Sequence, residues 1–478
     1  MTAHPVRIES LGTLIEGDET LTADSTYRAR RRQRDLTTGS LTKQILQLSV
    51  PSAAEQALFA LSGLVHAYWL GRVGGLALAA ITMGTTLRIA LISPMMGLSA
   101  GGMAVVARHV GAGEQRRADH AVAQVILLIV AFVVPLAIIG QLMGPTFLRW
   151  MGAKGELLES AVDYVRIIFG GLLFMEMLPT MNGVIRAAGH PEYTLRINIV
   201  NIAVMVLVAS VLVPGLGPFP ALGVRGAGWA AVVGSASGVA AQLVTLASGR
   251  SGVRLHLADV RPDLPTMGRV LRIAVPTAAQ RFSPNLANAV LMKLVSALGD
   301  QVLVAYSLMT RLSGFLQCPS FGLGSAAATM VGQNLGAKQP RRAQRATMLA
   351  ARAAIGCGLV LFSGLNIWPA SVLGVFERNQ AVVAVGLVAA RYLLFSGTAM
   401  AWSMVMGSAL VAAGDAVAAM LVSIGSMWLV QLPLCWALSG PLNMGAQGIW
   451  AGLVASYLVG AVVMTLRFRQ GRWKEIRV

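Results

Sequence analysis

Long apolar segments separated by short polar ones constrain this chain more than any other feature of its sequence. They recur from about residue 45 to about residue 467, and many exceed the roughly 18 residues that a membrane-crossing helix needs. In hydrocarbon, only helices and closed barrels satisfy every backbone hydrogen bond, and these runs are too continuous for barrel strands. Only 12% of the residues are charged, whereas a soluble protein has about 25%. The sequence therefore predicts an all-α polytopic membrane protein with about twelve transmembrane helices.

The chain contains an internal repeat with one constant spacing. Pro51-Ser-Ala-Ala corresponds to Pro276-Thr-Ala-Ala, a separation of 276 − 51 = 225 residues. The same spacing, without gaps, relates Gly97 to Gly322, Gly111 to Gly336, Arg116-Arg117-Ala118 to Arg341-Arg342-Ala343, and Ala187-Ala188-Gly189 to Ala412-Ala413-Gly414. Since each half holds six helices, both halves enter the membrane from the same side. The repeat predicts two six-helix parallel repeats related by an axis along the membrane normal.

The formal net charge is +18, which in a soluble domain would suggest a nucleic-acid partner. Here the basic residues lie mostly between apolar runs, and they alternate in density from one polar segment to the next. We interpret them as charges that set membrane orientation, so no nucleic acid is expected as a partner. The alternation predicts a multi-pass membrane protein with both termini cytoplasmic. The Ala-, Gly- and Arg-rich composition suggests a bacterium, so we expect the bacterial cell inner (plasma) membrane.

The same pattern divides the chain into five parts. A disordered basic cytoplasmic tail is expected over residues 1–42, and a basic, Pro-containing cytoplasmic linker over residues 249–266. The N-terminal six-helix lobe is expected over residues 43–248 and the C-terminal six-helix lobe over residues 267–468. Residues 469–478 complete the chain as a second cytoplasmic tail.

No motif in the sequence indicates an enzyme. No lysine follows a glycine and precedes a serine or threonine, as a nucleotide-binding loop requires, and the zinc motif His-Glu-x-x-His is missing. The three cysteines, Cys318, Cys357 and Cys435, lie in apolar stretches without metal-ligand spacing. We therefore expect no catalysis, no metal and no cofactor. An ion gradient, or a partner protein, has to supply the energy for any transport.

Several phrases together resemble the MATE (multidrug and toxic compound extrusion) transporters. The first half contains Leu48-Ser-Val-Pro51, Gly71-Arg-Val-Gly74 and Pro94-x-x-Gly97-Leu98, and the second half contains Val331-Gly-Gln-Asn-Leu-Gly-Ala337 and Gly445-x-x-Gly448-Ile449-Trp450. The resemblance covers roughly residues 42–470. It implies two six-helix bundles arranged in a V, and export of organic, often cationic, drugs or metabolites in exchange for H⁺ or Na⁺.

The residues that couple ions in that family are largely replaced here. Many bacterial members carry an Asp in the first helix, where this chain has His66. Their fifth helix supplies an Asn and an Asp at the positions of Met205 and Ala209. The NorM-type branch uses a Glu near Pro284 and an Asp near Met400. These departures leave the choice between proton and sodium open.

Three other ionisable residues of the apolar segments are therefore candidates for ion coupling. They are His66, Glu55 and Glu176. Glu55 and His66 are eleven residues apart, which returns a helix to within about 20° of the same face. An ionisable group inside the membrane is expensive to bury and is a functional candidate by default. The alternative is that His66 packs as a neutral residue and that each glutamate forms a structural ion pair with an arginine.

Further polar residues of the apolar segments are candidates for the lining of a central cavity between the lobes. They are Ser62, Asn182, Arg88, Arg281 and Arg311. Arg281 and Arg311 would either pair with the glutamates or meet an anionic substrate. Pro51 and Pro276 each remove a hydrogen bond near the start of a lobe and are predicted hinges, with a static bend as the alternative.

Three functions stay open at this point. The favoured one is a secondary active exporter of organic compounds, which the resemblance implies are cationic, working by proton- or sodium-coupled antiport. The second is a lipid-linked oligosaccharide flippase of the related superfamily, for which arginines would line the cavity. The third is a membrane receptor or scaffold that kept the fold. We expect the chain to act as a monomer, with the lipid bilayer and a small organic substrate as its partners.

Overall fold

The computed structural model describes residues 34–73, 75–216, 218, 220–256, 260–376 and 379–476. The side chains of residues 63–73, 94, 370, 375 and 376 lie outside this description. His66 is therefore placed only as a backbone position in a helix. Most of the predicted N-terminal tail, residues 1–33, also lies outside the described residues.

The first lobe is entirely helical within the described residues. Its elements are α2 (Leu41–Val73), α3 (Gly75–Ile92), η1 (Ser93–Met95), α4 (Met96–Gly111), α5 (Gln115–Trp150), α6 (Gly155–Gly170), α7 (Leu172–Ala187), α8 (Pro191–Leu212) and α9 (Gly223–Ala247). The second lobe has the elements α10 (Leu264–Ser296), α11 (Asp300–Leu316), α12 (Cys318–Gly336), α13 (Pro340–Ile367), α14 (Pro369–Phe376), α15 (Gln380–Ala413), α16 (Ala416–Gly425), the π-helical η3 (Ser426–Gln431), α17 (Leu432–Ser439), α18 (Ala446–Arg469) and η4 (Arg472–Lys474).

Consecutive short helices combine into longer units, and these correspond to the apolar segments of the sequence. In the described part of the chain, α3 continues through η1 into α4, α6 is followed by α7, and α11 by α12. Among the described residues, eight helical spans are long and apolar enough to cross a membrane, and one of them, Ala416–Ser439, combines α16, η3 and α17. The units that fall short are α2, α6–α7, α10 and α11–α12, and these units carry most of the polar residues considered below. Pro51 and Pro276, the predicted hinges, lie inside α2 and α10 without ending either helix.

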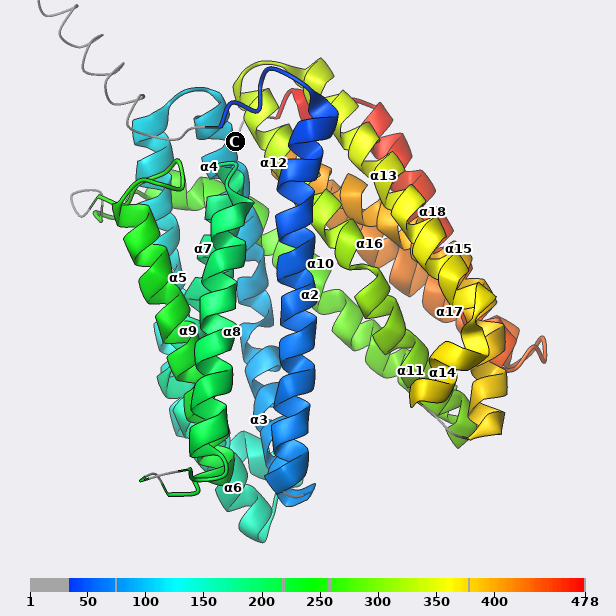
Figure 1. The fold of residues 1–478 in the computed structure, drawn as a ribbon. Helices are drawn as coiled ribbons and strands as arrows, with labels where there is room; N and C mark the ends of the chain where they lie inside the picture. Colours follow the sequence, from blue (N-terminus) through cyan, green and yellow to red (C-terminus); the bar gives the residue numbers. More distant parts are fainter. Residues whose placement is uncertain are drawn as a thin grey trace, which may run out of the picture.

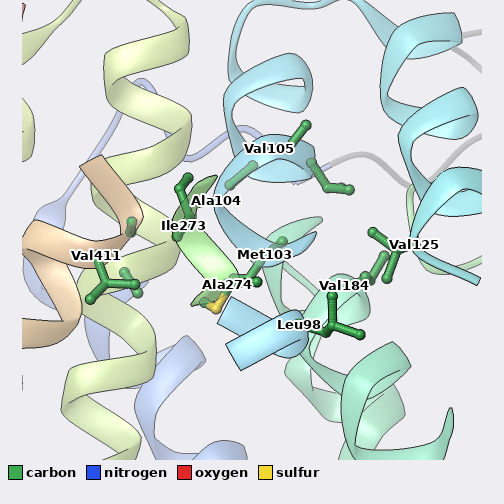
Figure 2. Close-up of a cluster of buried hydrophobic side chains, with 14 of the residues drawn as sticks. Leu98, Met103, Ala104, Val105, Val125, Val184, Ile273, Ala274 and Val411 are labelled. Carbon is green, nitrogen blue, oxygen red and sulfur yellow. The ribbon is translucent and has the colours of Figure 1, made fainter. Parts of the chain in front are cut away.

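The two lobes form a V (Figure 1). They meet at the end of the molecule that carries the α4–α5 and α12–α13 turns, which we call the closed end, and they diverge toward the other end. A single buried apolar cluster continues across the closed half. Figure 2 shows part of it, in which Leu98 and Val105 of α4 and Val184 of α7 lie near Ile273 of α10 and Val411 of α15.

The seam between the lobes repeats the symmetry of the sequence. A Cβ atom on Gly97 would lie 1.9 Å from the carbonyl oxygen of Ala274, and one on Gly322 would lie 2.3 Å from the carbonyl oxygen of Ser49. The repeat spacing converts one contact into the other. Gly97 corresponds to Gly322 and Ser49 corresponds to Ala274, since 322 − 97 and 274 − 49 both equal 225. Small residues thus let the α4–α10 and α2–α12 backbones approach at equivalent places.

The closing turns show the same reciprocity. A Cβ atom on Gly111 would lie 1.9 Å from the carbonyl oxygen of Gln333, and one on Gly336 would lie 2.1 Å from that of Arg108. These contacts again differ by 225 positions. The close approach therefore extends from Gly97, the second residue of α4, to Gly111, its last.

Residues 34–42 correct the predicted tail, because they are packed rather than disordered. Leu36 is 1% exposed, and its carbonyl oxygen accepts a hydrogen bond from Asn334 Nδ2 of the second lobe. Arg34 contacts the first lobe through the carbonyl oxygen of Gly189 and the Glu192 carboxylate. We call residues 34–40 the strap, because they touch both lobes at the closed end.

The predicted linker and C-terminal tail are also partly structured. α10 begins at Leu264, inside the range 249–266, because Asp263 and the Pro at the second helical position start the helix early. In the tail, Trp473 is fully buried and stacks on Phe468 with ring centroids 4.6 Å apart. An aromatic side chain of this size gains by burial even beyond the last long helix.

Candidate functional site

A buried polar cluster lies in the first lobe around the Glu55 carboxylate of α2. Arg186 Nη1 of α7 lies 2.9 Å from Glu55 Oε1 and 3.1 Å from Oε2. Asn182 Nδ2 donates to Oε1 over 3.3 Å, and the Thr194 hydroxyl of α8 donates to Oε2 over 2.7 Å. Both carboxylate oxygens therefore have donors, which is what a buried anion requires.

The helices place these donors by simple periodicity. Asn182 and Arg186 are four residues apart on α7 and so lie on one face. Behind them, Gln242 Nε2 of α9 donates to Asn182 Oδ1 over 2.7 Å and to the carbonyl oxygen of Leu178. Asn182, Thr194 and Gln242 are all at most 2% exposed. The amide of Asn182 is thereby fixed with its nitrogen toward Glu55.

Helix α12 of the second lobe reaches this cluster through the backbone of α7. The Thr329 hydroxyl donates to the carbonyl oxygen of Arg186 over 3.1 Å, and Gln333 Nε2 donates to that of Ala187 over 2.7 Å. Both acceptors belong to the last turn of α7, where carbonyl groups lack partners within the helix. One residue, Arg186, thus binds Glu55 with its side chain and the opposite lobe with its backbone.

A second ion pair lies about 15 Å from the first, nearer the start of α7, because Glu176 precedes Arg186 by ten residues. Arg88 Nη1 of α3 lies 2.8 Å from Glu176 Oε1, and both side chains are largely buried. The two membrane carboxylates that the sequence singles out are therefore each paired with an arginine. Their partners are Arg186 and Arg88, whereas the sequence pointed to Arg281 and Arg311.

The structure does not bring all the predicted site residues together. Glu55 and Asn182 are in contact, but no hydrogen bond or ion pair of the described residues joins Glu55 to Glu176. The side chain of His66 lies outside the described residues. The Ser62 hydroxyl donates to the Phe59 carbonyl oxygen of its own helix over 2.7 Å, so it is not part of the cluster.

Arg281 and Arg311 have a different environment from the other arginines. Both are exposed, and in the described part of the chain neither forms an ion pair. Arg281 follows Ala274 by seven residues and Ala278 by three, so it lies on the face of α10 that packs against α4. Arg281 thus faces the first lobe, one turn beyond the seam.

The replaced family positions of the fifth helix contain no polar group. Met205 and Ala209 lie on α8 and are 9% and 7% exposed. They pack in an apolar cluster with Ile168 and Val213. This part of the lobe is therefore apolar, and its polar chemistry is concentrated instead around Glu55, nearer the closed end.

Sequence reasoning missed three residues of the cluster. Arg186 lies at the end of an apolar segment, as the basic residues that set membrane orientation do, and Thr194 and Gln242 are common residues in polar positions of helices. The available signal was the four-residue spacing between Asn182 and Arg186. A buried carboxylate on α2 needs a cation, and no sequence pattern shows that the cation is 131 residues away.

Comparison with known proteins matches both halves of the chain to one family. The model of the family described as MatE matches residues 51–212 and again residues 276–437, so more than half of the chain is covered. The two matches are themselves 225 positions apart, since 276 − 51 and 437 − 212 agree. The family model thus recognises the same two repeats that the sequence predicts.

Individual relatives agree over nearly the full length. The probable multidrug resistance protein YoeA of Bacillus subtilis is 24% identical over 442 residues, covering 90% of this chain and 93% of the relative. Multidrug resistance protein PmpM of Pseudomonas aeruginosa is 24% identical over 446 residues, covering 91% and 92%. A solved structure described as the outward-facing conformation of a multidrug resistance MATE family transporter has a TM-score of 0.86 at 21% identity, covering 93% and 99%.

The repeated helices, the V-shaped pair of lobes and the double family match lead to one assignment. The predicted fold class is confirmed, and the relatives are transporters rather than enzymes. This chain belongs to the MATE family of multidrug efflux transporters.

Proposed function

We propose that this protein exports organic compounds, cationic ones among them, in exchange for protons, and that Glu55 is the proton acceptor. The observation that carries the proposal is the buried Glu55 carboxylate, bound by Arg186, Asn182 and Thr194 at the seam between the lobes. A carboxylate in such a place changes the local charge when it gains a proton, and its surroundings must respond.

The donor set around Glu55 favours a proton over Na⁺. All three neighbours of its oxygens are hydrogen-bond donors, and one of them is a guanidinium 2.9 Å away. A bound Na⁺ needs several oxygen ligands and is repelled by an adjacent fixed cation. A proton needs only the carboxylate oxygen itself. In the described residues, no group of three or more His, Cys, Asp and Glu side chains offers an alternative metal site.

A proton on Glu55 and a cationic substrate between the lobes oppose each other's binding. The ionised carboxylate attracts a cation bound between the lobes, whereas a protonated Glu55 leaves the positive charge of Arg186 uncompensated. Proton binding therefore weakens cation binding, which is the condition for antiport.

The state of the molecule is consistent with export. The closed end carries the basic residues Arg116, Arg117, Arg341 and Arg342, so the positive-inside rule places it in the cytoplasm of a bacterial cell. Both termini then face the cytoplasm, and the open side of the V faces outward. The similarity to a relative described as outward-facing supports this assignment.

The flippase alternative is less well supported. It requires several arginines free to bind a pyrophosphate group, but Arg88 is already neutralised by Glu176 at 2.8 Å. Two exposed arginines, Arg281 and Arg311, remain for that purpose. Among the relatives, the names that include a function refer to multidrug resistance.

Transport in proteoliposomes tests the proposal. Ethidium, a small organic cation, is supplied together with either a pH gradient or a Na⁺ gradient. We expect the pH gradient to drive wild-type transport, and Glu55→Gln to lower that rate at least about tenfold. Glu159→Gln, at an exposed position of α6, is the matched control and should keep the wild-type rate. Wild-type rates in Glu55→Gln, or transport driven by Na⁺ alone, would refute the proposal.

A further inference from the structure

We propose that Gln333 transmits the protonation state of Glu55 to the seam between the lobes, and so acts as a positioning residue for the conformational cycle. The inference rests on the proposed function of Glu55. It assigns to the second lobe a residue that responds to an event in the first lobe. The argument uses the hydrogen bonds at the end of α7 and the charges around Glu55.

The first step is the shared backbone. Gln333 is 2% exposed, and its side-chain nitrogen reaches the Ala187 carbonyl oxygen over 2.7 Å. Ala187 is the last residue of α7 and is adjacent to Arg186, the partner of Glu55. Any movement of the Arg186 side chain that shifts the final turn of α7 must therefore lengthen or break the Gln333 contact.

The second step is what protonation does to Arg186. Its Nε atom is already buried without a partner, so the guanidinium depends on Glu55 for its compensation. A neutral Glu55 would leave the largely buried Arg186 guanidinium as an uncompensated positive charge, which is unfavourable. A shift of the final turn of α7 away from its present position would reduce the energetic cost of that uncompensated charge. That movement separates it from Gln333.

The charges that face Glu55 come from few elements. α7 contributes Arg186, and α10 carries Arg281 on its face toward the first lobe. α8 contributes the uncharged Thr194, with Glu192 and His190 hydrogen-bonded to each other near its start. α9 contributes only the uncharged Gln242, through Asn182, and α12 has no charged residue. On α2, His66 lies eleven residues on, and its side chain is outside the described residues. Gln333 thus responds to the cluster without titrating itself.

The third step is the position of Gln333 in the seam. A Cβ atom on Gly111 would touch the Gln333 backbone, and Gly332 packs against Ala107. Residues 107 and 332 are related by the repeat spacing, so they exchange places under the pseudo-symmetry and lie at its axis. A hydrogen bond lost next to this axis weakens the contact that keeps the closed end shut.

The direction of the proposed change, from a molecule closed at the cytoplasmic end to one open there, suits an exporter that starts in this conformation. Protons arriving from the open side neutralise Glu55, the α7–Gln333 bond weakens, and the lobes separate at the closed end. The transporter then faces the cytoplasm, where the proton leaves and the bond can form again. Thr329 supports the same turn through the Arg186 carbonyl oxygen.

Distance measurements between spin labels test this link. Labels at Arg116→Cys and Arg341→Cys, two exposed positions at the closed end, report lobe separation after Cys318, Cys357 and Cys435 are replaced by Ala. In otherwise unaltered protein, we expect the separated fraction to rise as the pH is lowered from 8. Gln333→Ala should raise that fraction about tenfold at pH 8, the effect of one lost buried hydrogen bond. It should also abolish most of the further response to pH.

Gln317→Ala is the matched control. Gln317 Nε2 donates to the Gly397 carbonyl oxygen over 2.9 Å, and both residues belong to the second lobe. The control loses an equivalent buried bond, so it should lower stability while keeping the wild-type pH response. A full pH response in Gln333→Ala would overturn the link and leave Glu55 as the proton site. A full pH response in Glu55→Gln would instead overturn the proposed function.

Discussion

Arg186 binds Glu55 across 2.9 Å and at the same time offers its own carbonyl oxygen to Thr329 of the opposite lobe. The pair therefore joins two roles that are usually separated in a membrane protein. Its charges are compensated inside the first lobe, whereas its backbone is part of the contact between the lobes. A change in the charge of one partner has a direct route to the arrangement of the two lobes.

Removing one member of this pair should be costly. Arg186→Met leaves the Glu55 carboxylate buried without its cation, and we expect a loss of about 3–5 kcal/mol in the free energy of unfolding. The double variant Glu55→Leu with Arg186→Met removes both charges and should recover most of that stability without recovering transport. Thermal unfolding in detergent and transport assays measure the two effects. A single variant as stable as the wild type would contradict a buried, mutually compensated pair.

Side chains at the seam glycines should prevent closure. Gly97→Val places atoms where the Ala274 carbonyl oxygen now lies, and backbone atoms cannot move aside cheaply. We expect this variant to shift the population toward molecules separated at the closed end, as measured by accessibility of a cysteine at Ala107, which is fully buried against Gly332 in the closed seam. Gly314→Val is the control, since a Cβ atom there meets nothing within 4 Å. Equal accessibility in both variants would show that the seam is not tightly packed.

The strap should depend on Arg342. Its Nη2 atom donates to the Thr38 and Gly39 carbonyl oxygens and to Gln44 Oε1, each over 2.9 Å. Arg342→Ala removes these bonds, and we expect faster tryptic cleavage after Arg34. Arg341→Ala, an exposed neighbour, should leave the cleavage rate unchanged. No acceleration in Arg342→Ala would mean that the other strap contacts are sufficient.

The start of α10 should be sensitive to acid. The Thr266 hydroxyl donates to the Asp263 carboxylate, and with a further contribution from His120 this holds the pKa of Asp263 below its usual value. A lowered pKa in the folded state stabilises the protein above the unfolded-state pKa, and the benefit is lost as the pH falls through the folded-state pKa. Thermal unfolding between pH 6 and pH 2.5 should show a smaller decline in Asp263→Asn than in the wild type. Identical declines would exclude a contribution from this residue.

The sequence was sufficient for the architecture, and the reason is physical. Apolar run length determines which segments cross a membrane, and the constant spacing between Pro51 and Pro276 reveals the duplication. Glu55 could be selected because a carboxylate in an apolar segment is unusual. Arg186 could not be selected as its partner, because contacts between helices far apart in the chain depend on packing. The strap was missed for a similar reason, since Leu36 is buried only by surfaces that both lobes supply.

The central claim is that Glu55 carries the exchanged proton. Protein in weakly buffered detergent solution is mixed with ethidium, and the protons released on binding are measured with a pH indicator. We expect up to about one proton per bound ethidium in the wild type, and none in Glu55→Gln at equal ethidium occupancy. Unchanged proton release in Glu55→Gln would contradict the claim and assign the exchange to another group.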